Sequence, residues 1–121
     1  MSQSFGKKEK LKGKTAIKIL FEQGKSIRKF PVQLIYSPLP NIQNHQVAVS
    51  VPKRNFKKAT DRNRLKRQMR ESYRLNKHLV KNSTEYYGMM FIYTAKEKKD
   101  FDCIFTSVQQ LLEEFSKKTE S

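Results

Sequence analysis

The chain has 121 residues, which suits one small domain, and its hydrophobic share of 36% allows only a modest core. Its 26 Lys and Arg residues outweigh 11 Asp and Glu residues, and the formal net charge of +15 attracts polyanions such as nucleic acid or an anionic membrane surface. No apolar run approaches the roughly 20 residues that span a bilayer, and the N-terminal residues lack the apolar stretch of a signal peptide, which argues against insertion and export.

The single cysteine, Cys103, excludes an internal disulfide and is typical of a reducing compartment. We therefore expect a cytoplasmic protein. The sequence indicates neither a membrane partner nor an obligate protein partner.

The N-terminal part predicts a flexible segment followed by a short helix. Residues 1–13 are polar and basic without sustained periodicity. Ile17, Leu20 and Phe21 then recur at helical spacing after Thr15, a good N-cap residue. Gly24 stands where a helix-ending glycine belongs, so we expect the helix to end there.

Two strand-like stretches follow. Residues 32–36 are rich in β-branched and aromatic side chains, with Pro31 at the strand entry. Residues 47–51 alternate, with valines on one side and small residues on the other. Turn formers separate the two stretches, so we expect them to pair antiparallel. An extra short strand around 26–29 is allowed for.

The second half predicts a helix, a strand and a helix. A basic helix starts between 55 and 61 and ends near Asn82. The run at 86–94 is apolar on both faces, as a strand inside a sheet should be. The last helix extends from about 101 to 115 and shows apolar residues at helical spacing.

These elements predict an α+β fold, a small mostly antiparallel sheet packed with three helices in the order α-β-β-(β)-α-β-α. We expect residues 14–116 to form a single RNA-binding domain. Residues 1–13 are its basic, partly flexible N-terminal segment, and residues 117–121 are a polar tail.

The basic helix has two different faces. At 100° per residue, an apolar stripe suited to packing on the sheet forms on one side, from Leu65, Met69, Ser72, Tyr73 and Asn76. A contiguous arc of about 160° on another side is polar and cationic. It contains Asn63, Arg64, Lys66, Arg67, Arg70 and Arg74.

The charge is concentrated around this helix. Residues 52–74 hold ten cations, Lys53 and Arg54 among them, and two acids, a net charge of +8 out of +15. Phosphates would relieve the repulsion between like charges. Arginine binds phosphate oxygens bidentately and stacks on bases, and Asn63 can read a base edge or a 2′-hydroxyl. Composition alone does not separate RNA from DNA, and a plain solvated basic helix is the simpler alternative.

Catalysis by the protein itself has little support in the sequence. The acids are scattered and form no pair suited to metal-ion or general acid–base catalysis. Asp100 and Asp102 lie where they would cap the last helix. His45 and His78 have no cysteine or carboxylate at ligand spacing, so we predict no catalytic residue and no metal site.

The segment VAVSVPKRNFKKATDRNRLKRQMRESYR resembles the signature of the bacterial ribonuclease P protein subunit family, which centres on Arg-Asn-Arg, a Lys-Arg pair and a further Arg-Glu. The resemblance extends over most of the chain, from the Phe-Gly-Lys at residues 5–7 to the late hydrophobic strand. It implies a left-handed βαβ crossover through the motif helix, which is rare.

The resemblance also implies a function. The protein would bind a catalytic RNA, ribonuclease P RNA, which removes the 5′ leader of precursor tRNA with Mg²⁺ held through the RNA rather than by the protein alone. The implied contacts to the catalytic RNA are Arg62, Asn63, Arg64, Lys66, Arg67 and Arg70, to which the charge pattern adds Arg74, Lys53 and Arg54. The leader would bind between the first helix and the sheet, at Ile17, Phe21 and Tyr36, and we expect Tyr36 to be exposed.

Two other functions stay open. A ribosomal or ribosome-associated protein without enzymatic role would also be small, basic and α+β, and it would co-purify with ribosomal subunits. A DNA-binding module could lay the basic helix in a major groove, but the arginine arc is irregular and no dimerisation signal is visible.

Overall fold

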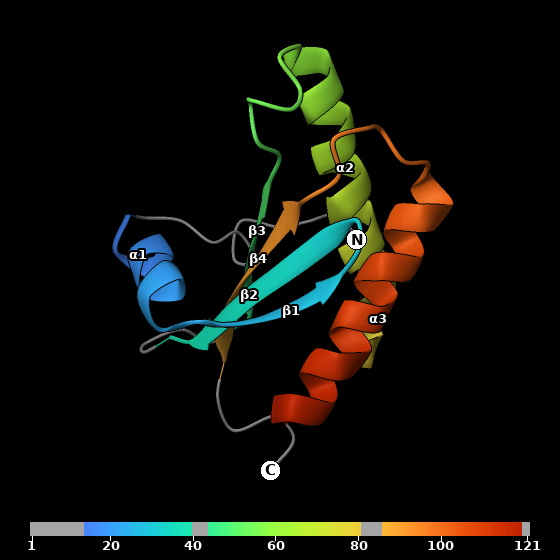
Figure 1. Cartoon of the computed structure of the whole chain (residues 1–121). Helices are drawn as coiled ribbons and strands as arrows, with labels where there is room; N and C mark the ends of the chain where they lie inside the picture. The colour runs from blue at the N-terminus through green and yellow to red at the C-terminus, as the bar shows by residue number, and fades with distance from the viewer. Residues whose placement is uncertain (1–13, 40–43, 81–85, 120–121) are drawn as a thin grey trace.

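A computed structural model describes residues 14–39, 44–80 and 86–119 (Figure 1). The observed order matches the predicted one, and the strand allowed for around 26–29 is present as β1. The elements are α1 (Lys14–Gln23), β1 (Lys25–Lys29), β2 (Val32–Pro38), β3 (Gln46–Ser50), α2 (Ala59–Asn76), the 3-10 helix η2 (Lys77–Leu79), β4 (Tyr87–Tyr93) and α3 (Phe101–Thr119).

The four strands form one sheet in the order β1-β2-β4-β3. β2 pairs antiparallel with both β1 and β4, whereas β3 pairs parallel with β4. The predicted antiparallel pairing of 32–36 with 47–51 is therefore wrong. β4 lies between these strands because six of its seven residues are buried, and a strand that is apolar on both faces belongs inside a sheet. β3, α2 and β4 form a parallel crossover, whose left-handedness stays a prediction.

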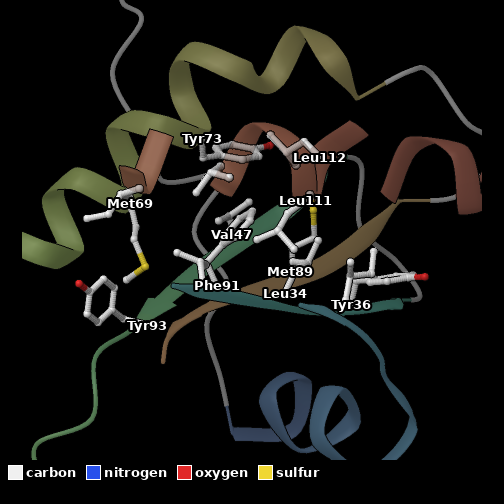
Figure 2. Packing of buried hydrophobic residues seen from close by; sticks show 14 of the residues in the cluster. Leu34, Tyr36, Val47, Met69, Tyr73, Met89, Phe91, Tyr93, Leu111 and Leu112 are labelled. Carbon is white, nitrogen blue, oxygen red and sulfur yellow. The ribbon is translucent and has the colours of Figure 1, made fainter. Parts of the chain in front are cut away.

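Helices cover both faces of the sheet. α2 and α3 lie on one face and α1 lies on the other, as Figure 2 shows around the main core. That core joins both helices to the inward side chains of the strands, and each fully buried large side chain contributes roughly 1.5–3 kcal/mol. Its members include Leu34, Val47, Met69, Tyr73, Met89, Phe91, Leu111 and Leu112.

A smaller cluster holds α1 against the opposite face. Leu20 and Met90 are buried there, and Ile17 and Ile35 pack around them. The backbone N–H of Gly24 donates to the carbonyl of Leu20 at 2.9 Å. A Cβ atom at Gly24 would lie 2.2 Å from that carbonyl oxygen, so only glycine fits and the predicted helix end is confirmed.

Some predicted boundaries are wrong. α1 begins at Lys14, so Thr15 lies inside the helix and is not its N-cap. α2 ends at Asn76 and continues as η2, while Asn82 lies outside the described residues. α3 extends through Thr119, so residues 117–119 of the predicted tail are helical. Residues 1–13, the predicted N-terminal segment, and residues 120–121 also lie outside the described ranges.

The start of α3 agrees with the prediction that an acid caps it. The Asp100 carboxylate accepts a hydrogen bond from the backbone N–H of Cys103 at 2.9 Å. Cys103 itself is half-buried. Among the helices that the structure describes, none combines the length and apolarity that a bilayer crossing requires.

Candidate nucleic-acid interface

The apolar stripe of α2 fixes the direction in which its cations point. All five residues predicted for the stripe are buried, and they are the buried residues of the helix: Leu65, Met69, Ser72, Tyr73 and Asn76. Because each residue turns the helix by 100°, the predicted cationic arc lies on the side that faces away from the sheet. The sequence prediction of a helix with an apolar and a cationic face is confirmed.

The outward face carries a row of cations. Asn63, Arg64, Arg67 and Arg70 are exposed, and Lys66 is half-buried. Within the described ranges, no carboxylate forms an ion pair with these four cations. Cations at i,i+3 and i,i+4 spacing repel each other by roughly 0.2–0.5 kcal/mol per pair, so this face is unfavourable for the isolated helix.

Arg74 differs from the other cations of α2. Its Nε donates to Glu71 Oε1 at 2.9 Å, and its Nη2 donates to Oε2 at 2.5 Å. This hydrogen bonding holds the pKa of the Glu71 carboxyl below its usual range. Since the carboxylate neutralises the guanidinium, Arg74 is less available for phosphate than the exposed arginines.

Arg62 has a structural role at the start of the helix. Its Nη1 donates to the carbonyl oxygens of Phe56 at 2.7 Å and of Lys57 at 3.0 Å. The side chain is half-buried and ties the preceding segment to the first turns of α2. The resemblance implied an RNA contact for Arg62, but one guanidinium nitrogen is already engaged within the protein.

Lys53 and Arg54 lie on the anchored segment before α2. Asn55 N–H donates to the Pro52 carbonyl at 3.3 Å and closes a turn, with both cations exposed at its tip. Phe56 is buried, with its ring 5.7 Å from that of Tyr93. Packing of the buried Phe56 thus fixes the turn, and the cations of the turn extend the charged face of α2.

Sequence reasoning left Lys57 and Lys58 out of the candidate residues. Both are exposed between the turn and the helix, so they connect the two groups of cations. Their position in the same charge run was a sufficient signal. We define the basic surface as the exposed or half-exposed cations and amide of this region: Lys53, Arg54, Lys57, Lys58, Asn63, Arg64, Lys66, Arg67 and Arg70.

The other face of the sheet carries two of the three predicted leader-binding residues. Phe21 on α1 is 59% exposed. Ile17 is half-buried in the small cluster under the same helix. The structure therefore brings Ile17 and Phe21 together beside a partly covered apolar surface.

Tyr36 does not belong to that surface, and the expectation that it is exposed is wrong. It is 4% exposed and lies on the opposite face of β2, with its ring 5.0 Å from that of Phe115 on α3. Burial raises the pKa of its hydroxyl. Because side chains of a strand alternate, the neighbour Ile35 faces α1 instead, where its Cγ2 lies 2.9 Å from the Cβ position of Gly24. The alternation could have identified Ile35 from the sequence.

The acids near the basic surface have partners of their own. Asp61, in the first turn of α2, accepts a hydrogen bond from Lys98 Nζ at 3.2 Å. Glu97 pairs with Lys99 at 3.6 Å in the same connector between β4 and α3. Across the described ranges, no group of three or more His, Cys, Asp or Glu side chains could hold a metal ion.

His45 has a structural partner at the far end of β4. Its Nδ1 accepts a hydrogen bond from the backbone N–H of Tyr87 at 3.0 Å. The ring lies 6.1 Å from that of Phe115, and burial lowers the pKa of the imidazole. The acceptor role requires Nδ1 to be unprotonated, so the fold favours neutral His45.

Comparison with known sequences identifies relatives over nearly the whole chain. A family model described as Ribonuclease P matches residues 5–117. The ribonuclease P protein component of Porphyromonas gingivalis W83 is 32% identical over an alignment of 112 residues that covers 88% of this chain and 82% of the relative. The ribonuclease P protein component of Thermotoga maritima is 29% identical over 121 residues, and the alignment covers 99% of each chain.

Solved structures share the fold. The RNase P protein of Staphylococcus aureus superposes with a TM-score of 0.73 at 19% identity, covering 88% of this chain and 94% of the other. The RNase P protein of Thermotoga maritima gives a TM-score of 0.73 at 24% identity, with coverage of 88% and 96%. The α+β architecture of a four-stranded mixed sheet with three helices is therefore common to all three chains.

Proposed function

This chain belongs to the ribonuclease P protein family, and from that premise we propose that it binds a catalytic RNA and the 5′ leader of precursor tRNA. In this proposal it is the accessory protein subunit of an endoribonuclease, and leader removal is the reaction it assists. The two RNAs would bind on different faces of the sheet, the catalytic RNA on the basic surface and the leader beside α1.

One observation supports the catalytic-RNA site above all others. Arg64, Arg67 and Arg70 form an exposed row with no ion-pair partner in the described part of the chain. Their helix is held by a fully buried stripe, so the row is presented rigidly. Binding of an anion relieves the repulsion between these cations, and a folded RNA presents closely spaced phosphate groups that can do so.

The basic surface would act by position and charge. Each arginine fork can donate hydrogen bonds to two phosphate oxygens, and Asn63 can donate to and accept from a base edge or a 2′-hydroxyl. A site that neutralises 6–10 phosphates loses roughly 10³–10⁵-fold in affinity between 50 and 200 mM salt. Steep salt dependence is thus the signature of this surface.

The hydrolysis itself is assigned to the RNA and the Mg²⁺ that it binds, as the family resemblance implies. The acids closest to the basic surface support this division, because Asp61 is engaged by Lys98 and Glu71 by Arg74. The protein residues would hold the RNA in its active fold and keep the leader near it.

The leader would lie on the small apolar surface beside α1. Phe21 offers an exposed ring, and Ile17 and Ile35 belong to the partly buried apolar cluster under the same helix. Stacking on an aromatic ring contributes roughly 1–3 kcal/mol per base and tolerates any base. This property suits a leader whose sequence varies from one precursor to another.

Reconstitution tests the whole proposal. The protein is mixed with a bacterial ribonuclease P RNA and a labelled precursor tRNA at a Mg²⁺ concentration too low for the RNA alone. We expect cleavage at the mature 5′ end only when both components are present. Cleavage by the protein alone would contradict the assignment of the chemistry, and co-purification from cells with ribosomal subunits rather than this RNA would favour a ribosomal role.

A second experiment tests the leader surface separately. Phe21→Ala should weaken binding of precursor tRNA to the reconstituted complex by about tenfold and leave binding of mature tRNA unchanged. The matched control is Leu75→Ala, which removes a 41%-exposed apolar side chain from α2. Equal losses for precursor and mature tRNA would contradict a leader site at Phe21.

A further inference from the structure

An exposed aromatic ring lies at the turn between β1 and β2, outside both proposed RNA sites. Phe30 exposes 67% of its surface, more than Phe21 at 59%. It belongs to neither hydrophobic cluster of the fold. An apolar ring in this position contributes little to folding, and an exposed apolar side chain that folding does not explain can mark an interaction site.

The turn that carries Phe30 is fixed on both sides of the ring. The carbonyl of Lys29 accepts a hydrogen bond from the Ser107 hydroxyl of α3. The carbonyl of Pro31 accepts from Thr94 twice, from its backbone N–H at 2.8 Å and from its hydroxyl at 3.1 Å. Phe30 is therefore presented by a clamped backbone and not by a free loop.

One cation lies over the ring, and others lie on the neighbouring segments. Lys99 Nζ lies 5.6 Å from the centroid of Phe30, a cation–π distance. Arg28 on β1, two residues before Phe30, is exposed, and so is Lys96 on the connector that carries Lys99. The same connector holds Lys98, whose ammonium reaches Asp61 in the first turn of α2 at 3.2 Å. The surroundings of Phe30 are thus linked to the beginning of the basic surface.

We propose that Phe30 and Lys99 form a stacking site for an unpaired nucleotide of a bound RNA strand. This inference rests on the proposed function, since it extends the RNA contacts of the basic surface around the end of the sheet. The base stacks on the ring, and Lys99 contacts the flanking phosphate. The ion pair of Lys99 with Glu97, at 3.6 Å and partly exposed, is weak enough to be exchanged for that phosphate.

The chemistry favours RNA over another protein. A fixed aromatic ring beside cations is the arrangement that binds single-stranded nucleic acid, through stacking and backbone charge together. One isolated ring beside a lysine is too small an apolar area for a stable protein contact. The nucleotide can come from the catalytic RNA or from the precursor, and the third experiment below separates these sources.

Fluorescence tests the stacking directly. The chain contains no tryptophan, so Phe30→Trp introduces a single reporter. Titration with a 12-nucleotide oligo(A) strand should quench its emission, and a 12-base-pair RNA duplex should quench it far less. The control is Tyr86→Trp, at a 41%-exposed aromatic position at the opposite end of β4, where we expect little quenching. Equal quenching at both positions, or none at Phe30→Trp, would overturn the stacking site.

Affinity provides a second measure. Phe30→Ala should weaken binding of the same single strand by about tenfold and leave the duplex unaffected, while Phe30→Tyr should retain wild-type affinity. An equal loss for strand and duplex, or a loss that tyrosine does not rescue, would refute stacking at this position.

Crosslinking in the assembled complex identifies the source of the nucleotide. A photoreactive phenylalanine analogue at position 30 is placed in the complex of protein, ribonuclease P RNA and precursor tRNA, with each RNA labelled in turn. A crosslink to either RNA supports the proposal and names the source. Crosslinks only to a second copy of the protein, or to neither RNA while the same analogue at Arg67 does crosslink, would overturn this inference and leave the proposed function intact.

Discussion

The two long helices α2 and α3 lie side by side on one face of the sheet but differ in charge (Figure 1). α2 has 18 residues with six cations and two acids, a net charge of +4. α3 has 19 residues with two cations and three acids, a net charge of −1. Both bury an apolar stripe in the same core. The core therefore does not require the charge of α2, and its exposed arginines are available to a partner outside the fold.

Two of the five charged side chains of α3, Glu114 and Lys118, have ion-pair partners inside the protein. Glu114 lies 3.2 Å from Lys29 of β1 and 3.8 Å from Lys118 one turn further along the helix. On α2 only Arg74 has such a compensating carboxylate on the helix itself, at Glu71. α3 thus has a small net charge, whereas α2 carries an exposed row of arginines, Arg64, Arg67 and Arg70, without ion pairs in the described part of the chain.

The largest expected effect concerns what the two helices have in common. Leu65→Ala on α2 and Leu111→Ala on α3 each remove a side chain that is at most 1% exposed. Each should lower the free energy of unfolding by about 2–5 kcal/mol, because a cavity remains in the core. Urea unfolding followed by circular dichroism measures both, with the exposed Leu75→Ala as control. If the free energy of unfolding fell only slightly for one of the two variants, the buried sides of α2 and α3 would not contribute equally to the core.

A second prediction compares two arginines on α2 itself. Arg67→Gln should weaken binding of the catalytic RNA by about tenfold and lower the slope of log affinity against log salt by about one unit. Arg74→Gln should do less on both counts, because Glu71 already neutralises its guanidinium. Filter binding at four salt concentrations gives both slopes. A larger loss for Arg74→Gln would contradict the role assigned to Glu71.

A third prediction distinguishes a residue that supports the basic surface structurally, Arg62, from a residue that contacts the RNA, Arg64. Arg62→Ala removes the hydrogen bonds to the carbonyls of Phe56 and Lys57 and should cost about 1 kcal/mol of unfolding free energy. Its salt slope should stay near that of the wild type. Arg64→Ala should show the opposite behaviour, a slope lower by about one unit with stability within about 0.5 kcal/mol of the wild type.

The result that would contradict this role for Arg62 is a lower salt slope without any loss of stability.

The smallest expected effect is a pH dependence on the α3 side of the sheet. Burial lowers the pKa of His45, so the unfolded chain binds more protons than the folded one as the pH falls through the ordinary range of histidine. The contribution of neutral His45 to the free energy of unfolding should therefore be complete at pH 7.5 and smaller at pH 5.5. His45→Asn keeps an acceptor for Tyr87 N–H without titrating and should flatten this dependence, whereas the exposed His78→Asn should not. Identical pH profiles for both variants would contradict the assignment.

The features that depend on local periodicity could be read from the sequence. The five buried residues of α2 follow from 100° per residue alone, and the central position of β4 follows from its apolar character on both faces. The role of Gly24 as the end of α1 has an equally local cause, since its close approach to the Leu20 carbonyl needs no distant residue.

Apart from the helix boundaries and the face of Tyr36, the errors concern contacts between distant parts of the chain. β2 and β3 are neighbours in sequence, yet β4 enters between them about 40 residues later, and nothing in the two strands themselves shows this. Tyr36 was placed by resemblance on the face that Ile35 occupies, a shift of one residue that exchanges the two sides of a strand. The hydrogen bonds of Arg62 depend on the path of residues 52–58, which no pattern in the sequence specifies.

The most direct test of the account compares two variants with the same change in charge. The triple variant Arg64→Gln, Arg67→Gln and Arg70→Gln removes three charges from α2, and Thr106→Glu, Gln110→Glu and Lys117→Gln change the exposed face of α3 by the same amount. We expect the α2 variant to lower affinity for the catalytic RNA by at least about 100-fold and the salt slope by about three units, while the α3 variant stays within about threefold of the wild type. Equal losses in both variants would show that RNA responds only to the overall charge of the protein, and the basic surface would then not be its binding site.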